Sequence, residues 1–437
     1  MNLPTLPNRP FQIIVFGVFI LFAIVGLFLF ANFTGFGTTA AKIGTVTIWG
    51  VLPEGAVSPE LDALKAQQKE YANVQYVQKP ADTFDAVLSD GIASGIGPDV
   101  ILISQEQLLA EKNKLNVIPF SVISERAYLA SFVPLTELFL TSQGTYGIPF
   151  TVDPLVLYYN RTLLSSAGIA MPPSTWEAIT GLAPRLTQKN GAQVVKSAIA
   201  LGSYQNVPNA SAILSLLFFQ AGSPITTLSN GTVRAALTQS TAGNTVGVNP
   251  AESALSFYTQ FADPAKTVYS WNGSLPDARQ AFTSGDLALY LGFASEEPFL
   301  AAANPNLDFD MAAVPQPAMS QVRTTYGRAY AFAIPKATRN ETGGIAVARA
   351  LTTKELALQA AHALSMAPAE RALLSPAAND KFAAVFYPEA LVAKGWLSPL
   401  PERTDSIFAA MIGTILSGRS SVQDALEKAN QALDSAF

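Results

Sequence analysis

Few residue types in this chain are suited to covalent or metal chemistry. It has no cysteine and a single histidine, His362, so thiolate nucleophiles, disulfides, iron–sulfur clusters and Cys/His zinc sites are excluded. The histidine lies in "AAHALSMAP", whose pattern predicts a buried helix and a structural role. No Walker A motif is present. The sequence therefore predicts no catalytic residue, no cofactor and no metal.

Asp153 is the residue whose placement most needs an explanation. It lies in "YGIPFTVDPLVLYYNR", residues 146–161, between two apolar strand segments, and no basic residue occurs before Arg161. A carboxylate in such a place can accept hydrogen bonds from two neighbouring hydroxyl groups of a ligand. It can equally cap backbone N–H groups of the protein itself. The residues alone leave both interpretations open.

The elements that position Asp153 follow an alternating pattern. "GTVTIWG", "VQYVQKP" and "PDVILIS" predict strands, and "SPELDALKAQQKEYANV" and "DTFDAVLSDGIASG" predict the helices between them. The alternation recurs after Arg161, where Ser174 and Glu177 of "PPSTWEAITGLAPRL" predict a capping box. From Gly343 to Phe437 the pattern is almost wholly helical. This order predicts an α/β fold with helices packed on a parallel sheet.

Length and charge narrow the class of protein. A chain of 437 residues is long for one compact domain and predicts two lobes. The formal net charge of −5 argues against a nucleic-acid partner, which would require a basic face.

The N-terminal residues predict a membrane anchor. Ile13 to Ala31 form an uncharged apolar run of 19 residues, which as a helix spans about 28 Å and matches the hydrocarbon core. Arg9 precedes the run and Lys42 is the first charge after it, so the positive-inside rule keeps the N-terminus in the cytoplasm. We expect residues 1–10 to be cytoplasmic, 11–31 to cross the membrane and 32–43 to form a tether. A cleaved signal peptide is the alternative, since "TTAA" at 38–41 offers small residues to a peptidase.

Several segments, in order, resemble a known family. They are "GPDVILI", "YGIPFTVDPLVLYYNRTLLSSAGI" with "PPSTWEAI", "FTSGDLALYLG", "AFAIPKAT" and "SGRSSVQDALEKAN". Together they resemble the extracellular solute-binding proteins of ABC importers, the family that includes maltose-binding protein. The resemblance implies a type II-like periplasmic-binding-protein fold over residues 44–437. Two lobes, about 44–150 with 316–376 and about 154–314 with 380–437, would close on a ligand.

The resemblance also implies ligand contacts at and around the first hinge crossing. Asp153 matches an acidic contact to sugar hydroxyls in maltose-binding proteins. Where that family has Gly-Pro-Trp, this chain has Gly292, Phe293 and Ala294, so the sugar-stacking tryptophan is missing and maltodextrin specificity is in doubt. Phe293 or Glu296 would take over its place. Asn209 lies in a loop that matches a further source of ligand contacts.

Other candidates come from strand ends and from the return crossing. Trp49 and the following Glu54 lie at the carboxyl end of a strand, where α/β folds bind ligands, although Trp49 suits the core nearly as well. Trp271 lies near a cleft aromatic of the family, and Asp405 aligns with an aromatic sugar contact but lacks the ring. Two further residues, Tyr326 and Arg328, lie in the return crossing.

Arg328 has three possible roles on sequence grounds. Its guanidinium lies among apolar residues and needs a partner. It would pair with Asp153 or Glu296, contact an anionic or acidic-sugar ligand, or lie solvated at the surface.

These observations predict a monomeric, membrane-anchored, extracytoplasmic solute-binding protein. It would capture a small ligand, such as a mono- or disaccharide, and deliver it to the permease of an ABC transporter. A sensing module that presents its ligand to a receptor is the main alternative. A glycoside hydrolase using Glu296 with a second carboxylate is a remote one.

Overall fold

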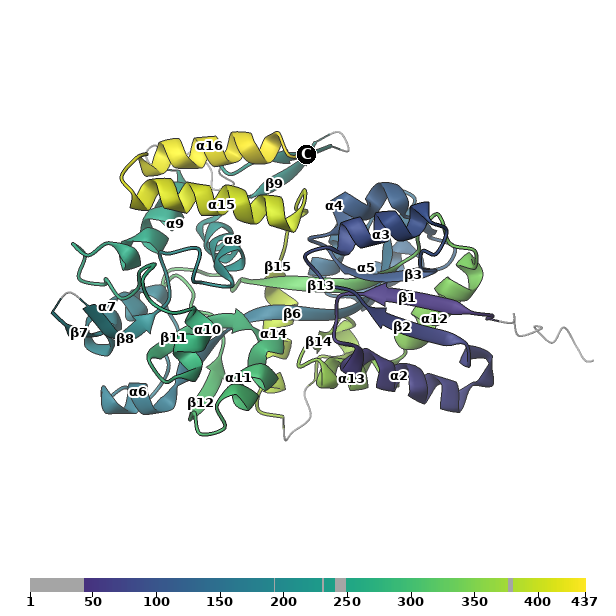
Figure 1. Ribbon diagram of the computed structural model, residues 1–437, viewed down its shortest axis with the longest axis horizontal. Helices are drawn as coiled ribbons and strands as arrows, with labels where there is room; N and C mark the ends of the chain where they lie inside the picture. Colours follow the sequence, from purple (N-terminus) through teal and green to yellow (C-terminus); the bar gives the residue numbers. More distant parts are fainter. Residues whose placement is uncertain (1–42, 192, 230–231, 240–248, 376–379) are drawn as a thin grey trace, which may run out of the picture.

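The computed structural model describes residues 43–191, 193–229, 232–239, 249–375 and 380–437. The expected anchor at 11–31 and the tether up to residue 42 lie outside this described part. Within it, no helix combines the length and apolar character needed to span a bilayer. The described chain forms two α/β lobes connected by strands that run from one lobe into the other (Figure 1).

Lobe 1 is built on a parallel sheet with helices on both faces. Along the central strand, Val100 and Leu102 pack into one apolar cluster and Ile101 and Ile103 into the other, as the two-residue period of a strand requires. The strands of this lobe are β1 (Val46–Gly50), β2 (Val74–Gln78), β3 (Val100–Ser104), β4 (Ile118–Pro119) and β5 (Gly144–Thr145). Its helices are α2 (Glu54–Gln67), α3 (Phe84–Ala93), α4 (Leu108–Glu111), α5 (Glu125–Ser131), α12 (Glu341–Leu351) and α13 (Lys354–Ala363).

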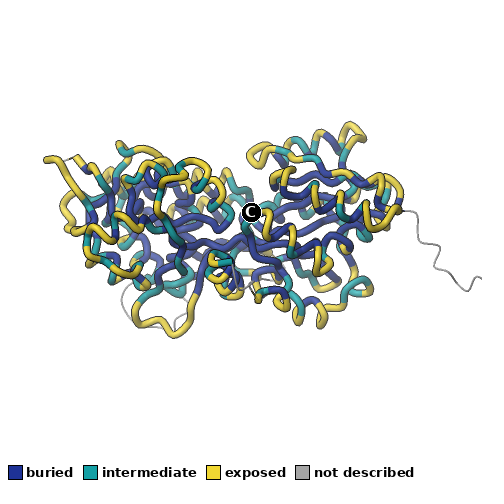
Figure 2. The backbone as a smooth tube through the Cα atoms, turned by 90° about the horizontal axis from the view of Figure 1, so that it is seen from below, coloured by how far each residue is buried: buried dark blue, intermediate teal, exposed yellow. Residues whose placement is uncertain are grey.

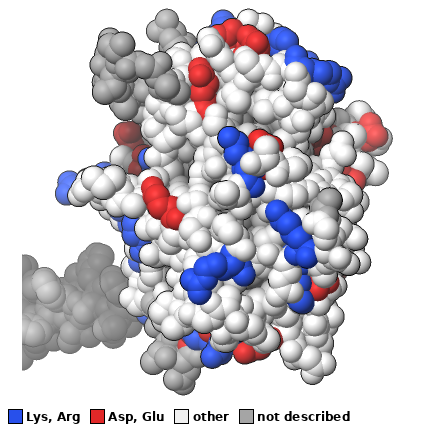
Figure 3. All heavy atoms as spheres, turned by 90° about the vertical axis from the view of Figure 1, so that its left-hand side faces the viewer, with Lys and Arg blue, Asp and Glu red and all other residues white. Residues whose placement is uncertain are grey.

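Lobe 2 repeats this architecture with more helices. Its strands are β7 (Gln188–Asn190), β8 (Gln193–Ile199), β9 (Thr226–Ser229), β10 (Thr232–Ala235), β11 (Leu287–Phe293) and β12 (Phe309–Ala312). Its helices are α6 (Arg161–Ser166), α7 (Trp176–Leu186), α8 (Ala210–Ala221), α9 (Pro250–Thr259), α10 (Ala278–Thr283), α11 (Glu297–Ala303), α15 (Pro401–Leu416) and α16 (Val422–Asp434). A 3-10 turn, η5 (Ala294–Glu296), links β11 to α11. On the outer end of this lobe, charged side chains of both signs are scattered among uncharged ones (Figure 3).

Two long strands, β6 (Gly147–Asn160) and β13 (Thr325–Ala333), connect the lobes. They pair with each other in antiparallel fashion, while β13 also pairs with β3 of lobe 1 and β6 with β11 of lobe 2. One sheet, in the order β2-β1-β3-β13-β6-β11-β8-β7, therefore continues through both lobes. The connecting strands are coloured as buried along most of their length (Figure 2).

The two prolines of β6 lie where its ladder is interrupted. Pro154 is opposite Gly327, and the next residue, Leu155, already pairs with Phe293 of β11, so the missing N–H falls at the change of partner. Pro149 lies beside the register shift at Tyr330/Ala331. A proline inside a buried strand is thus tolerated because the ladder is irregular at that point.

A third connection between the lobes packs against these two strands. It consists of β14 (Ala367–Pro368), α14 (Ala383–Val392) and β15 (Ala393–Lys394); α14 packs on β6 and β13, and β15 pairs with β13. The loop before β13 belongs by its contacts to lobe 2, because Gln316 exchanges backbone hydrogen bonds with residues 174 and 176. The boundary expected at residue 316 lies within this loop.

Two local predictions were wrong. His362 is in a helix, but 83% of its side chain is exposed, because it faces away from the apolar stripe of α13. The cap of α7 is Thr175, whose hydroxyl accepts from the Ala178 N–H at 3.2 Å, rather than Ser174. Glu177 closes no capping box there, since its carboxylate accepts from the Ala318 N–H of the neighbouring loop. Trp176, the first residue of α7, is buried.

Candidate functional site

Asp153 lies in the middle of β6 and is 2% exposed. Its Oδ1 accepts a hydrogen bond from the Ser295 N–H at 3.1 Å, and its Oδ2 accepts one from the Ser295 hydroxyl at 2.6 Å. Burial raises the pKa of Asp153 to about 7, against the lowering effect of the Ser295 bonds and of the Arg328 charge. The capping interpretation is therefore the geometry observed. A contact with ligand stays a prediction.

Arg328 lies opposite Asp153 in the β6–β13 ladder but forms its ion pair elsewhere. Its Nε donates to Oε2 of Glu106 at 2.9 Å, and the Tyr326 hydroxyl donates a short hydrogen bond to the other oxygen of the same carboxylate. Burial alone would lower the pKa of Arg328, but the Glu106 carboxylate, together with Tyr330, Tyr326 and Asp153, outweighs burial and raises the pKa overall. Of the three possible roles, pairing with Asp153 or Glu296 is not the one observed, because Glu106, which follows β3, forms the ion pair with Arg328.

The guanidinium of Arg328 also contacts lobe 2. Its Cζ lies 4.1 Å from the centroid of the Phe293 ring, within cation–π range. That ring meets the Tyr326 ring edge-on, with centroids 6.3 Å apart. Phe293 is nearly fully buried, and the guanidinium rather than solvent lies against its ring.

Residues of lobe 1 form hydrogen bonds with the connecting strand β13. The Gln105 side chain donates to the Gly327 carbonyl at 3.1 Å and accepts from the Ala329 N–H at 2.7 Å, as a neighbouring strand would. Glu106, the next residue, holds Arg328. This two-residue segment is therefore the hydrogen-bonded link between lobe 1 and the part of β13 that enters lobe 2.

Glu296 belongs to a separate network inside lobe 2. Its Oε1 accepts from the Asn209 side chain at 2.7 Å and from the Phe293 N–H at 2.9 Å. Its Oε2 accepts from the Tyr290 hydroxyl at 2.6 Å and from Nε of Arg279 at 2.7 Å. Four donors thus saturate the carboxylate, and the predicted ligand contacts Glu296 and Asn209 bind each other.

Gly292 supports this network by its lack of a side chain. A Cβ there would lie 2.7 Å from the Tyr290 ring and 3.1 Å from the Glu296 carboxylate. Its role in the structure is therefore to let two side chains pass close to the backbone.

The two tryptophans predicted to contact ligand are enclosed. Trp271 is 1% exposed, and its indole N–H donates to the Asn206 amide oxygen at 3.2 Å. Trp49 is 8% exposed; its ring packs against Gly91 of α3, and the Lys79 ammonium lies 4.2 Å from the ring centroid. The core interpretation of Trp49 is the one observed. Neither ring offers a free face to a sugar in this conformation.

The last two candidates lie at the surface. Glu54 is exposed at the start of α2, where its backbone N–H donates to Gln78 at 3.0 Å. Asp405, exposed in the first part of α15, accepts from the Tyr204 hydroxyl at 2.7 Å. Of the predicted residues, the structure thus brings Asp153, Phe293, Tyr326 and Arg328 together at the crossing. Trp49, Glu54, Trp271 and Asp405 make their contacts elsewhere.

Sequence reasoning missed Glu106 and Ser295. Glu106 comes two residues after a strand that is buried on both faces, and the rule that α/β folds bind at the carboxyl ends of strands could have found it. Ser295 had no comparable pattern, because its partner Asp153 is 142 residues away.

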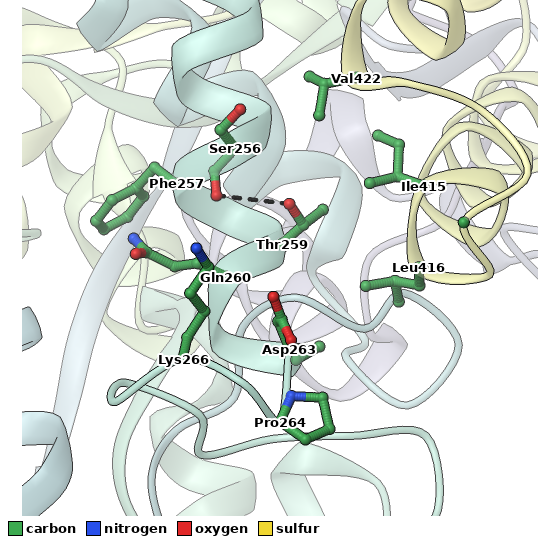
Figure 4. Close-up of a pocket in the computed structure, with 12 residues that line it drawn as sticks. Ser256, Phe257, Thr259, Gln260, Asp263, Pro264, Lys266, Ile415, Leu416 and Val422 are labelled. Carbon is green, nitrogen blue, oxygen red and sulfur yellow. Dashed lines mark hydrogen bonds between the residues drawn. The ribbon is translucent and has the colours of Figure 1, made fainter.

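The hollows described on the surface lie outside this cluster. One of about 600 Å³ is formed in lobe 2 by the end of α9 and the turn between α15 and α16 (Figure 4). Its lining includes Phe257, Gln260, Asp263 and Lys266, and no residue of lobe 1. A site that closes when the lobes move must contact both, so we place the candidate site at the crossing cluster rather than in this hollow. Among the described residues, no group of His, Asp and Glu side chains is arranged to hold a metal.

Comparisons with known proteins agree with this architecture. The family model for bacterial extracellular solute-binding proteins matches residues 55–357. No curated protein matches the sequence.

Solved structures with the same fold include several proteins that are named for a sugar or bound to one. The cyclic α-maltosyl-1,6-maltose-binding protein of Arthrobacter globiformis is 17% identical, with a TM-score of 0.73 over 90% of this chain and 98% of that one. An ABC transporter solute-binding protein of Thermotoga lettingae, bound to α-D-tagatose, is 19% identical, with a TM-score of 0.68 over 90% and 99%. The maltotriose-binding protein of Thermus thermophilus is 17% identical, with a TM-score of 0.66 over 90% and 100%. These likenesses confirm the predicted two-lobed fold.

Proposed function

This chain belongs to the family of bacterial extracellular solute-binding proteins, and on that premise we propose that it captures a small carbohydrate between its lobes for an ABC transporter. It is a binding protein and not an enzyme. The proposed ligand is a mono- or disaccharide, because the tryptophans available for stacking on a longer glucan are enclosed.

The observation that carries the proposal is the cluster at the crossing strands. Glu106 comes from lobe 1, Arg328 from the crossing strand and Phe293 from lobe 2. A carboxylate and a guanidinium suit a ligand with many hydroxyls, and the buried Phe293 ring supports the guanidinium from lobe 2. A ligand on Glu106 and Arg328 contacts lobe 1 and the strand that enters lobe 2, and closure of lobe 2 over it would favour the closed state through its differential affinity. The sugars named for the structural relatives support the same ligand class.

We propose three further ligand contacts, which lie outside the Glu106–Arg328 pair. Asp153 would contact the ligand through lone pairs that the Ser295 bonds leave free, since each carboxylate oxygen accepts two hydrogen bonds. Glu54 and Asp405, both exposed, would approach the ligand from the rims of the two lobes.

We propose that the apolar run at 13–31 anchors the protein in the cytoplasmic membrane, with both lobes outside. The family is extracellular, and the run has the length and charge asymmetry of a single-pass helix. Anchoring would hold the lobes close to a transporter permease. The alternative partner is a membrane receptor, and affinity capture of the full chain with bound sugar would distinguish a permease from a receptor.

Thermal unfolding of the full chain tests the proposed function. The protein would be held in a detergent without a sugar head group and monitored by tryptophan fluorescence against mono- and disaccharides, amino acids, short peptides and organic anions. A ligand at 100 times its Kd stabilises the native state by about 2.7 kcal/mol, which is several degrees in Tm. We expect a shift with at least one sugar. Shifts with amino acids or peptides alone would contradict the carbohydrate proposal.

A further inference from the structure

The side chain of Arg328 is held by both lobes at once. Its Nε donates to Oε2 of Glu106, a lobe 1 residue, at 2.9 Å. Its Cζ lies 4.1 Å from the ring centroid of Phe293, a lobe 2 residue. The ion pair and the ring contact together fix the position and the plane of the guanidinium, which is pre-organised before any ligand arrives.

Most of the donors on this guanidinium are free. Glu106 uses the Nε–H, and no described residue accepts a hydrogen bond from either terminal nitrogen. Neither nitrogen is among the buried unpaired atoms of the described chain, and 35% of the side chain is exposed. Since arginine carries five N–H donors, four remain for a solute at this point.

The charges around Arg328 are already balanced. Glu106 neutralises the guanidinium, and inside lobe 2 Arg279 and Glu296 neutralise each other. Asp153, opposite Arg328 in the ladder, adds a further carboxyl without a cation of its own, and burial raises its pKa to about 7. The ammonium of Lys79 lies over Trp49, away from the described contacts of this cluster. Lys394, opposite Tyr326 on β15, is exposed. An acidic ligand on the Arg328 guanidinium would therefore place a second negative charge beside Glu106.

From this geometry we infer that Arg328 determines the specificity of the site: its free N–H donors read the oxygens of an uncharged sugar, and the Glu106 carboxylate beside it rejects acidic sugars. The inference rests on the proposed function and names the ligand class within it. Glu106 acts as a charge filter because it neutralises the Arg328 guanidinium, which would otherwise attract a carboxylate or a phosphate.

Removing the charge of Glu106 should weaken or abolish the preference for a neutral sugar over an acidic one. In Glu106→Gln the side chain keeps its shape and one acceptor, but the guanidinium loses its counter-charge. A uronate would then find an uncompensated arginine with a fork of donors that matches a carboxylate. A purely structural role of Glu106 would lower the affinity for neutral and acidic sugars alike.

The experiment is a set of calorimetric titrations with matched pairs of sugars. The probes are glucose and glucuronate, and galactose and galacturonate, added to the full chain in a detergent without a sugar head group. We expect the wild type to bind one neutral member, and its acidic partner about tenfold more weakly or worse; in Glu106→Gln this ratio should fall by about tenfold or more. Asp308→Asn is the matched control, since it removes a carboxylate from the exposed Arg161–Asp308 pair at 3.6 Å and should leave the ratio unchanged.

Arg328→Lys provides a second variant. It keeps the charge but loses the planar fork, so the affinity for the neutral sugar should fall while the rejection of the acid persists. Equal binding of both members by the wild type, or an equal loss of both in Glu106→Gln, would overturn the inference and leave the proposed function standing. Binding of no member of any pair would contradict the proposed function and the inference together.

Discussion

Two glutamate–arginine pairs in this protein use the same chemistry in different places. Glu106 with Arg328 and Glu296 with Arg279 both pair through Nε, at 2.9 and 2.7 Å, and each arginine lies over a phenylalanine ring. All four donors on Glu296 come from lobe 2. Both donors on Glu106 come from the crossing strand β13. The Glu296 carboxylate therefore holds lobe 2 together, and the Glu106 carboxylate joins lobe 1 to the strand that connects the lobes.

The comparison shows that residue type does not decide the role of such a pair. The two arginines are about equally exposed, so exposure does not decide it either. What differs is whether the pair lies within one lobe or connects a lobe to the strand between the lobes. A pair within one lobe is unchanged when the lobes move. Changes at Glu296 should therefore act on stability, and changes at Glu106 and Arg328 should act on binding.

The largest effect is expected for Glu296→Ala. It leaves Arg279 and the Asn209 and Tyr290 side chains without their shared acceptor, and removal of one partner of a largely buried ion pair costs about 3–5 kcal/mol. Urea unfolding of the full chain measures this loss. Asp308→Ala, at an exposed pair, should stay within about 0.5 kcal/mol of wild type. Equal stability of the two variants would contradict the scaffold role of Glu296.

A smaller, pH-dependent effect is expected for Asp153→Asn. The pKa of Asp153 is raised from 3.8 to about 7 in the folded state, so the native protein binds a proton that the unfolded chain has released. The contribution of this group to stability is complete below about pH 4 and is lost as the pH rises through about 7. Relative to Asp153→Asn, the wild type should therefore lose about 1 kcal/mol or more of stability between about pH 4 and pH 8.

Unfolding of both proteins across this pH range checks the prediction. The buried carboxyls of Glu111 and Glu389, whose pKa values are also raised to about 7, are present in both proteins and cancel in the difference. A difference that stays constant with pH would show that Asp153 does not titrate in this window.

The smallest effect is expected for Phe293→Leu. The change removes the ring beneath Arg328, and a cation–π contact at a partly exposed arginine contributes about 0.5–1 kcal/mol, a few-fold in affinity. Titration with the bound sugar measures it. Phe299→Leu is the matched control, because that ring lies beneath Arg279 at 5.3 Å and away from the crossing strands. A larger loss of affinity in the control would reverse the assignment of the two pairs.

The sequence predicted the elements better than their partners. The strands at 100–104 and 147–160 are marked by apolar runs. The pairing of Glu106 with Arg328 joins residues 222 positions apart, and no local pattern encodes such a contact. Trp271 was predicted to contact ligand because it lies near a cleft aromatic of the resembled family, and the local sequence does not show whether such a tryptophan faces a cleft or the core.

Paired fluorescence labels on the two lobes give the most direct test of sugar-driven closure. The chain has no cysteine, so Ser94→Cys after α3 and Ser406→Cys on α15, both exposed, would be unique labelling sites on opposite lobes (Figure 1). We predict that energy transfer between the labels changes in a saturable way on addition of the sugar that stabilises the protein, and that the midpoint shifts in Arg328→Lys. Unchanged transfer at a saturating concentration of that sugar would contradict binding between the lobes.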